Sequence, residues 1–225
     1  MATLASTWQT FFSLDRPGKI VCVGLNYHDH AGESGMSSPT EPLLFGKFPN
    51  TLIGPGEPIV LPSASAHVDA EAELAVVIGA TAHNVNRTRA MDYVFGFTVA
   101  NDVSARDLQF GDGQWFRGKG FDTFCPVLPQ IAPRSEVPDP HDLRVVQRVN
   151  GTVLQDGSTR DLIFDVPTLV AFASGVMTLE PGDLILTGTP PGVGYFRDPR
   201  IALRPGDTVE VEVEGIGTLT NPVAA

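Results

Sequence analysis

The stretch VDAEAELAVVIG, residues 68–79, is followed after a short break by YVFGFTVANDVS, residues 93–104. Both runs are apolar and rich in β-branched or aromatic residues, so both are predicted to be strands. Side chains alternate along a strand, so Glu71 and Glu73 point to the same face, while Asp102 ends the second run. Three carboxylates beside a core need a positive partner, and Mg²⁺ or Mn²⁺ suits them because hard cations take oxygen ligands.

The carboxylate pair also has an ordinary interpretation. Glu-x-Glu pairs are common, and Glu71 can equally face water beside an arginine. The pair alone is therefore a weak sign of a metal site, and other residues with matching chemistry must support it.

Short strand-like runs recur through the rest of the chain. They are apolar, β-branched and bounded by Gly, Pro, Asn or Asp, which is typical of strands in a mainly β protein. The clearest are KIVCVGLNY (19–27), EPIVLP (57–62), LRVVQRVNG (143–151), DLILTG (183–188), DTVEVEVEG (207–215) and GTLTNPV (217–223).

Two details refine the predicted strands. Asn150-Gly151 and Asp156-Gly157 are turn signals of the kind that favours β-hairpins. The run 207–215 alternates between apolar and acidic residues, which predicts a half-solvated edge strand with its glutamates facing outward.

Helices are predicted to be few and short. DVPTLVAFASGVM (165–177) is the best candidate, because Pro167 lies near its start and its apolar residues have helical spacing. TRAMDYVF (88–95) can begin as one helical turn, and TWQTFFSL (7–14) fits either a helix or a strand. We therefore expect an α+β fold, mainly β and mostly antiparallel.

Composition limits the possible functions. The chain has 225 residues, 15 basic and 26 acidic, which gives a net charge of -11 and argues against nucleic acid as a partner. It contains no 18-residue apolar stretch, so no membrane association is expected. Cys22 and Cys125 lie in apolar runs and are predicted to be buried thiols, which favours a cytoplasmic location.

A histidine and a glutamate follow the first apolar run. His30 and Glu33 are three residues apart, so one helical turn puts them on the same face. A carboxylate that orients an imidazole makes it a better general base toward water. Taken alone, the segment fits a solvated polar turn at least as well.

Arg106 and Gln109 follow Asp102 in the segment SARDLQ (104–109). Arg106 can hold a substrate carboxylate with two parallel hydrogen bonds, and Gln109, on the same face, can bond a ketone or enolate oxygen. The alternative is that Arg106 pairs with Asp102 or Asp107.

Two glycine-bearing loops add further candidates. Lys119 lies between glycines in RGKGFDTF (117–124), where its ammonium can stabilise an enolate, although a surface lysine fits equally well. TGTPPGVG (187–194) offers backbone N–H groups and the Thr189 hydroxyl to a carboxylate. The sequence has no dinucleotide fingerprint, nucleophile elbow or zinc-type cluster, so nicotinamide and flavin cofactors are not expected.

Taken together, these blocks resemble the fumarylacetoacetate hydrolase family. The resemblance covers nearly the whole chain after about residue 17, in the family's order and spacing. It is carried by KIVCVGLNYHDHAGE, LFGKFPNTLIGPGEPIVLP, DAEAELAVVIG, DYVFGFTVANDVSARDLQ, QWFRGKGFDTF, RVNGTVLQDG and LEPGDLILTGTPPGVG. The length is similar to that of the short acylpyruvase-type members.

The resemblance implies a mixed β-roll or β-sandwich over residues 18–225, preceded by a lead-in over residues 1–17. It implies a site for Mg²⁺ or Mn²⁺, usually in a homodimer. In the family's pattern Glu71, Glu73 and Asp102 match the metal ligands, and His30 with Glu33 matches a catalytic dyad on a lid. Lys119 matches a catalytic position, and the substrate-contacting positions are matched by Arg106, Gln109 and Thr189.

The chain departs from the family's pattern at two positions. The long fumarylacetoacetases have a fourth carboxylate ligand where this chain has Val23, so three protein ligands and water are expected here. Family members often have serine after the lysine, whereas this chain has Gly120, which puts the placement of substrate by that loop in doubt.

The resemblance implies an enzyme acting on a 2-oxo acid. The first expectation is metal-dependent hydrolysis of a C–C bond in acylpyruvate-type 1,3-diketo acids, through a pyruvate enolate. The same enolate chemistry serves an isomerase of 2-hydroxyhepta-2,4-diene-1,7-dioate or 5-carboxymethyl-2-hydroxymuconate in aromatic catabolism, or an oxaloacetate-type decarboxylase. A non-catalytic protein that binds small acids is the remaining alternative, and the complete set of matching residues argues against it.

Overall fold

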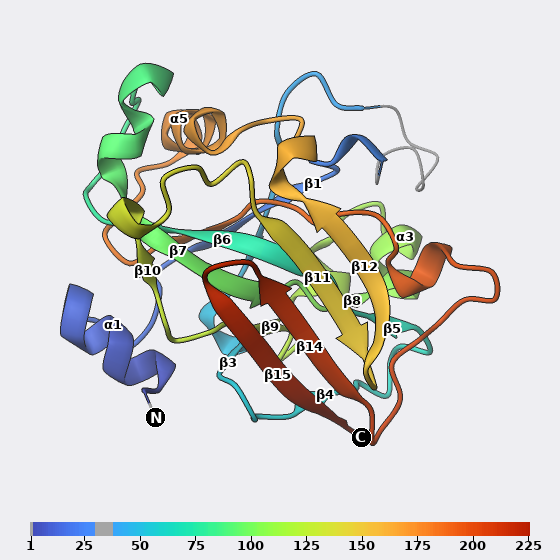
Figure 1. The fold of residues 1–225 in the computed structure, drawn as a ribbon. Helices are drawn as coiled ribbons and strands as arrows, with labels where there is room; N and C mark the ends of the chain where they lie inside the picture. Colours follow the sequence, from blue (N-terminus) through green and yellow to red (C-terminus); the bar gives the residue numbers. More distant parts are fainter. Residues whose placement is uncertain (1, 30–37) are drawn as a thin grey trace.

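The fold is α+β and mainly β, as the sequence predicts. The computed structural model describes residues 2–29 and 38–225, and its strands form two large sheets, with short helices around them (Figure 1). The six-stranded sheet runs in the order β10 (Ala132–Pro133), β7 (Val94–Asn101), β6 (Ala72–Ile78), β13 (Leu184–Leu186), β1 (Ile20–Gly24) and β2 (Leu43–Lys47). The five-stranded sheet runs in the order β12 (Thr152–Ser158), β11 (Arg144–Val149), β14 (Thr208–Val213), β15 (Gly217–Ala224) and β4 (Ile59–Val60).

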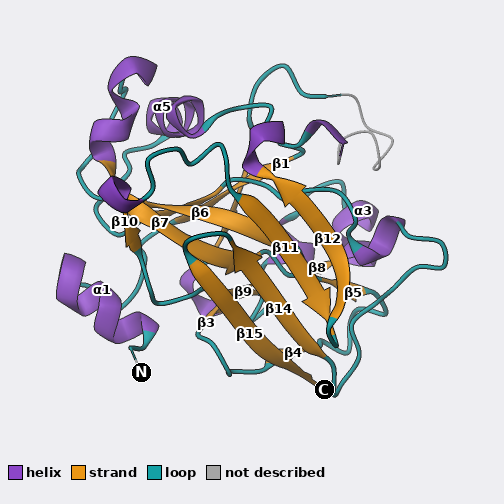
Figure 2. Cartoon of the chain, in the orientation of Figure 1, coloured by secondary structure: helices purple, strands orange, loops and turns teal. Residues whose placement is uncertain are grey.

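Smaller elements connect the two sheets (Figure 2). Two short ladders pair β3 (Leu52–Ile53) with β9 (Cys125–Pro126), and β5 (Val68–Asp69) with β8 (Ser104–Ala105). The α-helices are α1 (Leu4–Phe12), α3 (Arg106–Gly111), α4 (Phe116–Lys119) and α5 (Val166–Val176). The 3₁₀ turns are η1 (Pro49–Thr51), η2 (Arg87–Tyr93), η3 (Arg134–Glu136), η4 (Thr159–Asp161) and η5 (Gly194–Phe196).

The main core lies between the two large sheets. Leu74 and Val76 of β6 share one buried cluster with Val145 of β11 and Val211 of β14. Every residue of β6 is buried, and Ala75 and Val77 on its other face belong to a second buried cluster that includes Trp8 of α1. A continuous apolar run is what such a strand requires.

The pairing of β6 with β7 brings the predicted carboxylates to one end of the sheet. The strands are antiparallel, and Ala72 lies opposite Asn101. One residue further out, the backbone N–H of Asp102 donates to the carbonyl of Glu71 at 3.0 Å. The side chain of Asn101 accepts from the N–H of Glu71, also at 3.0 Å, so both carboxylate-bearing segments are fixed beyond the ladder.

The position of β14 corrects one expectation. The strand is not at an edge, because it pairs with β11 on one side and with β15 on the other. Its alternation is real, since Val209, Val211 and Val213 are buried, and the outward-facing Glu212 pairs with Arg148 at 2.8 Å. Alternation indicates that one face of the sheet is solvated, but it does not show whether the strand has a neighbouring strand on one side or on both.

Only one of the two hairpin signals marks a turn. Asn150 and Gly151 have φ angles of 51° and 78° and join β11 to β12. Asp156 and Gly157 instead lie within β12. A Cβ at Gly157 would lie 2.5 Å from the Cβ of Pro190, so glycine serves here for close approach of a loop.

All three segments predicted as possible helices contain helix, and 88–95 overlaps the 3₁₀ turn η2 and the start of β7. The 165–177 run forms α5, whose N-terminus is capped by Asp165 accepting from the N–H of Thr168 at 2.9 Å. The segment 7–14, which fitted either a helix or a strand, belongs mostly to α1, where Trp8 is fully buried and donates to the Gly182 carbonyl at 2.7 Å.

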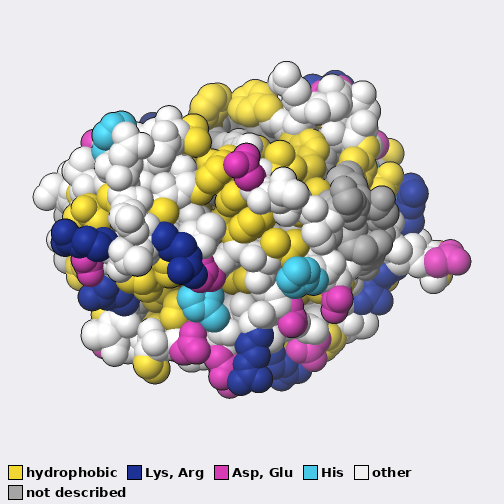
Figure 3. Space-filling view, turned by 90° about the horizontal axis from the view of Figure 1, so that it is seen from above, with side chains coloured by type: hydrophobic (Ala, Val, Ile, Leu, Met, Phe, Trp, Pro, Cys, Tyr) yellow, Lys and Arg dark blue, Asp and Glu magenta, His cyan; other side chains and the backbone are white. Residues whose placement is uncertain are grey.

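The visible surface carries charged side chains of both signs, and both cysteines are buried. On the face drawn in Figure 3, Lys and Arg side chains are interspersed with Asp and Glu side chains. Among the described residues, no helix is long and apolar enough to cross the bilayer. Cys22 and Cys125 are both free and buried, as predicted.

Candidate metal and substrate site

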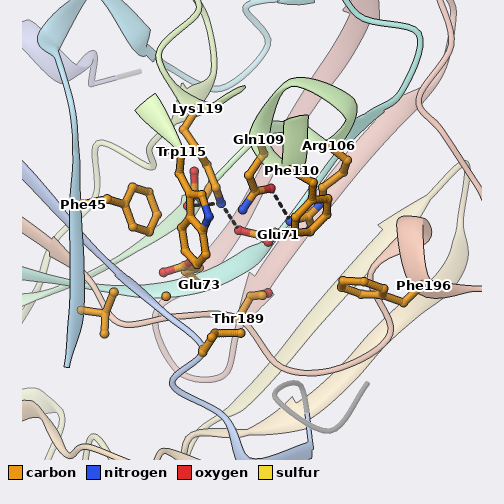
Figure 4. Close-up of a pocket in the computed structure, with 14 residues that line it drawn as sticks. Phe45, Glu71, Glu73, Arg106, Gln109, Phe110, Trp115, Lys119, Thr189 and Phe196 are labelled. Carbon is orange, nitrogen blue, oxygen red and sulfur yellow. Dashed lines mark hydrogen bonds and ion pairs between the residues drawn. The ribbon is translucent and has the colours of Figure 1, made fainter. Parts of the chain in front are cut away.

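The three predicted ligands converge at the end of β6 and β7. Glu71 precedes β6, Glu73 lies within it, and Asp102 follows β7. All three are buried, and each offers a carboxylate oxygen within 4.8 Å of the others. Figure 4 shows Glu71 near the centre of the pocket that these residues line, with Glu73 below it. The sequence spacing therefore predicted correctly that the three carboxylates converge.

A buried ammonium lies against two of these carboxylates. The Nζ of Lys119 is 2.6 Å from Oε2 of Glu71 and 2.7 Å from Oδ2 of Asp102. Burial lowers the pKa of Lys119, but Asp102 and Glu71 outweigh it and raise the pKa above its usual value. Lys119 is thus a charged group inside the site and not a surface lysine.

A second buried lysine supports Asp102 from behind. The Nζ of Lys47 lies 2.7 Å from Oδ1 of Asp102. It also donates to three backbone carbonyls, those of Val103 at 3.0 Å, Lys119 at 2.6 Å and Phe124 at 2.7 Å. Lys47 therefore joins a predicted metal ligand to the segment that carries Lys119.

Glu73 is the least compensated carboxylate of the three. Its Oε2 accepts from the backbone N–H of Gly188 at 2.6 Å. Burial raises the pKa of Glu73 well above its usual range, and the charges of Asp102 and Glu71 add to this. A positive charge placed among these carboxylates would stabilise their charged forms and lower the pKa of Glu73.

The donor set fits a hard divalent cation. Three carboxylates supply oxygen ligands, which Mg²⁺ and Mn²⁺ prefer over nitrogen or sulfur. Oδ1 of Asp102 is buried and makes no hydrogen bond, since its contact with Lys47 is an ion pair without hydrogen-bond geometry. Glu71, Glu73 and Asp102 are therefore the residues that would hold the ion.

Arg106 and Gln109 lie on one face of α3, as their spacing predicts. The guanidinium of Arg106 does not pair with Asp102 or Asp107, which was the alternative. It contacts Oε1 of Glu71 at 2.7 Å and Oδ2 of Asp69 at 3.2 Å. Its Nη1 donates to Oε1 of Gln109 at 3.1 Å, which turns the amide nitrogen of Gln109 away from Arg106.

Thr189 lines the pocket, but its hydroxyl is engaged within the protein. It donates to the carbonyl of Ala72 at 2.9 Å and accepts from Nε2 of Gln155 at 2.7 Å. Oε1 of Gln155 in turn accepts from the N–H of Ala72 at 2.9 Å. These bonds fix the loop that presents the N–H of Gly188 to Glu73.

Apolar side chains complete the pocket. Figure 4 shows Phe45 and Trp115 on one side of Glu71, and Phe110 and Phe196 on the other. The cavity volume between these walls is about 30 Å³, which is room for only a few water molecules. The described residues therefore leave only a narrow space beside Lys119.

Several site residues were missed from the sequence. Lys47 was given no role in the sequence, although it is buried and pairs with Asp102. Asp69 lies two residues before Glu71 and so shares its strand periodicity. The aromatic walls, Phe45, Trp115, Phe110 and Phe196, come from separate segments and carry no local signal.

The predicted dyad cannot be placed. His30 and Glu33 lie outside the described residues, so their pairing stays a prediction. His28, which precedes them, is exposed. At Gly120, an added Cβ would lie 2.8 Å from the carbonyl oxygen of Phe116, so this arrangement of α4 suits glycine better than serine.

Known proteins share this arrangement of blocks. The profile of the fumarylacetoacetate hydrolase C-terminal domain matches residues 19–224. A human mitochondrial oxaloacetate tautomerase is 50% identical over 210 residues, which cover 92% of this chain and 67% of the relative. The chain thus spans about two thirds of that relative's length.

Two solved structures extend the comparison. A 5-carboxymethyl-2-hydroxymuconate delta-isomerase from Mycobacterium smegmatis is 48% identical with a TM-score of 0.83, covering 92% of this chain and 79% of its own. A fumarylpyruvate hydrolase from Pseudomonas aeruginosa, solved with Mn²⁺ and pyruvate, is 31% identical with a TM-score of 0.85, covering 92% and 90%. Since the family profile spans nearly all residues and the fold agrees with these enzymes, the chain belongs to the fumarylacetoacetate hydrolase family.

Proposed function

We propose that the protein is a divalent-metal-dependent enzyme that interconverts the keto and enol forms of a short 2-oxo diacid such as oxaloacetate. The observation that carries the proposal is the position of Lys119. Its ammonium is buried between Glu71 and Asp102, at 2.6 and 2.7 Å, and faces the pocket that Arg106 and Gln109 line. A fixed positive charge at this point stabilises an enolate, the species that keto and enol forms share.

Each residue of the site has a role in this proposal. The metal, held by Glu71, Glu73 and Asp102, supplies Lewis-acid polarisation of the 2-oxo acid. Lys119 stabilises the negative charge that develops on the enolate oxygen. Gln109 offers its amide N–H groups to a substrate oxygen, because its own oxygen is bound to Arg106.

Arg106 is the residue proposed to meet the second carboxylate of the diacid. Its contacts use one N–H of Nε, one of Nη1 and two of Nη2. One N–H of Nη1 remains to donate to a substrate oxygen. With a divalent ion bound, the site is also net positive, since three cations and the ion exceed the four buried carboxylates by one charge, and this attracts an anionic substrate.

The charge count follows from the described site residues. Lys47, Arg106 and Lys119 contribute three positive charges, and the carboxylates of Asp69, Glu71, Glu73 and Asp102 contribute four negative charges. A divalent ion changes the sum from -1 to +1. An anionic substrate is then attracted to the site, because a buried net positive charge without a counter-charge is costly.

Tautomerisation is favoured over hydrolysis by the relatives. The human relative at 50% identity is an oxaloacetate tautomerase, and the Mycobacterium smegmatis structure at 48% is a hydroxymuconate isomerase. Both names describe movement of protons and double bonds without loss of carbon. The human relative is mitochondrial, and the cytoplasmic location stays a prediction for this chain.

Hydrolysis of acylpyruvates is the second candidate. A specific observation favours it, namely the fumarylpyruvate hydrolase solved with Mn²⁺ and pyruvate, whose fold matches at a TM-score of 0.85. Hydrolysis needs an activated water in addition to the enolate site, and that task is predicted for His30 with Glu33. The same dyad can move the proton in tautomerisation.

A substrate panel tests the proposal. Oxaloacetate, a hydroxymuconate and an acylpyruvate are incubated with the protein and Mg²⁺, or with EDTA. Loss of the enol absorbance of oxaloacetate is followed together with carbon dioxide and pyruvate, which separates tautomerisation from decarboxylation. We expect keto–enol exchange faster than without protein when Mg²⁺ is present, and exchange at the uncatalysed rate with EDTA. Exchange at the uncatalysed rate in both conditions would contradict the proposal.

A further inference from the structure

A fourth buried carboxylate, Asp69, lies behind the site and has no assigned role. It belongs to β5 and is 2% exposed. Its Oδ2 accepts from Nε of Arg106 at 3.3 Å and from Nη2 at 3.2 Å. The pairing of β5 with β8 fixes this contact, because Asp69 lies opposite Ser104 and the N–H of Arg106 donates to the His67 carbonyl at 2.9 Å.

The same carboxylate binds the backbone of a segment at the mouth of the pocket. This segment, Gly194–Phe196, is called the rim below. Oδ1 of Asp69 accepts from the N–H of Gly194 at 3.1 Å, and Oδ2 accepts from the N–H of Tyr195 at 2.9 Å. Asp69 is thus bonded to Arg106 and to the rim at once, although they are about ninety residues apart in the sequence.

The rim brings an aromatic wall into the pocket. Phe196 lines the cavity, and its ring lies 6.2 Å from that of Phe110, which lines it too. Tyr195 packs against Phe110 at 5.3 Å and edge-on against His67 at 4.9 Å. Phe110 belongs to α3, the helix that begins at Arg106, so the rim and this helix share one packed interface.

The backbone of the rim leaves little freedom. A Cβ at Gly194 would lie 2.2 Å from the carbonyl oxygen of Ile201 and 3.0 Å from Oδ1 of Asp69. The N–H of Ile201 donates to the Gly194 carbonyl at 2.9 Å. The rim is therefore drawn close to Asp69, and the position of Phe196 depends on that contact.

We propose that Asp69 is a positioning residue that fixes Arg106 and the rim in one arrangement, and thereby sets the length of diacid that the site accepts. The inference rests on the proposed function. Arg106 meets the distal carboxylate, and Phe110 with Phe196 closes the space next to it. Because one carboxylate holds both, the room between guanidinium and rim is set by Asp69 and not by the substrate.

Asp69→Asn is the decisive variant. It keeps the size of the side chain but replaces one acceptor oxygen by an NH₂ group. On the Oδ2 side that group would face three donors, the N–H of Tyr195 and two of Arg106. Asp183→Asn is the matched control, because Asp183 is also buried, pairs with Lys19 and accepts from two backbone N–H groups far from the site.

The first measurement is amide hydrogen exchange of the metal-free folded protein. In Asp69→Asn we expect the amides of Gly194 and Tyr195 to exchange about tenfold faster or more, since a charged acceptor is lost. In Asp183→Asn the same amides should exchange as in the wild type. Wild-type protection of the rim in Asp69→Asn would overturn the proposal without any reference to activity.

The second measurement is selectivity. The ratio of kcat/KM for oxaloacetate over a longer 2-oxo diacid should fall about tenfold in Asp69→Asn, mainly through KM for oxaloacetate. Phe196→Ala should lower the same ratio. The double variant should fall no further than the larger single effect, because both changes act on the rim.

The outcomes separate the inference from the proposed function. A wild-type protein that turns over no 2-oxo acid would contradict the proposed function. An active Asp69→Asn whose selectivity ratio stays within about twofold of the wild type would overturn the inference alone. If Asp69→Asn does not fold, Asp69→Glu, which keeps the charge but displaces the rim, should give the same fall in selectivity.

Discussion

Lys47 and Asp102 form an ion pair inside the protein, with Nζ 2.7 Å from Oδ1 and at most 1% of either side chain exposed. The pair comes from the edge strand β2 and from the end of β7, which lie on different parts of the six-stranded sheet. Lys47 also holds the carbonyl of Lys119 at 2.6 Å. One buried cation therefore fixes a predicted metal ligand and the segment that carries the proposed catalytic ammonium.

Lys47→Met should destabilise the protein strongly. The variant keeps the length of the side chain but removes one of the two cations paired with Asp102 and leaves three carbonyl oxygens without the Lys47 donor. Removing one partner of a buried ion pair typically costs about 3–5 kcal/mol. The free energy of unfolding in urea measures this, and an unchanged m-value would show that the compactness of the denatured state is not the cause.

Lys19→Met is the matched control for this change. Lys19 pairs with the buried Asp183 at 2.7 Å, but its own side chain is 35% exposed. Exposed pairs contribute about 0–1 kcal/mol, so this variant should lose much less stability. A loss in Lys47→Met no larger than in Lys19→Met would show that the more deeply buried network around Lys47 does not contribute more stability than the partly exposed pair.

Much of the site could be predicted because its ligands follow strand periodicity. Glu71 and Glu73 lie two residues apart, and Asp102 ends the neighbouring strand, so local pattern alone brings them together. Lys47 could not be predicted in the same way. Its partners are carbonyl groups of Val103 and Phe124, and a pattern of side chains does not report where distant backbone groups converge.

The same limit applies to the fold, where features set by local pattern were predicted and contacts between distant segments were not. The alternation of β14 predicted one solvated face correctly, but its place inside the sheet depends on β11 and β15, which are separate segments. Gly157 was taken as a turn residue because Asp-Gly favours hairpins. Its actual role depends on Pro190, whose Cβ would meet an added Cβ at 2.5 Å, and this contact is not local in sequence.

Lys119→Met should separate catalysis from metal binding. The proposed function assigns its ammonium to the developing enolate, and loss of one such donor lowers kcat about 10²–10³-fold. Affinity for Mg²⁺ should rise, because Nζ now lies 2.6 and 2.7 Å from oxygens of two predicted ligands. Calorimetric titration with Mg²⁺ and initial rates on oxaloacetate measure the two effects.

Arg117→Met provides the control within the same helix. Arg117 is a cation of α4 that pairs with Asp112 on the surface, away from the predicted ligands. Both kcat and Mg²⁺ affinity should stay near wild-type values. Weaker Mg²⁺ binding in Lys119→Met would contradict the view that its ammonium competes with the ion.

Cys125 should make stability fall at alkaline pH. Burial raises the pKa of its thiol from 9.0 to about 12. Between these values the unfolded chain releases the proton and the folded chain keeps it, so stability is complete below pH 9 and is lost as pH rises toward 12. The slope for this thiol approaches 1.4 kcal/mol per pH unit, at about 25 °C.

Cys125→Ala tests the assignment of this slope. The variant lacks the titrating thiol, so its urea stability should approach that of the wild type as pH rises from about 8 to about 10. Cys22 is buried as well, and burial raises its pKa, so part of the slope should remain. A difference between wild type and variant that is the same at both pH values would exclude Cys125 as a source.

His30→Ala decides whether the predicted dyad activates water. In a hydrolase the variant should lose acylpyruvate cleavage by about 10²-fold or more, the usual contribution of a general base. Mg²⁺ affinity should not change, because the predicted ligands are Glu71, Glu73 and Asp102. His28→Ala is the matched control, since His28 is a neighbouring exposed imidazole with no predicted role.

If the protein is instead a tautomerase that uses the dyad only to move protons, His30→Ala should slow keto–enol exchange. Solvent deuterium should then enter the substrate more slowly than with the wild type. Cleavage at the wild-type rate in His30→Ala would exclude His30 as the base and leave the protein without its predicted source of activated water.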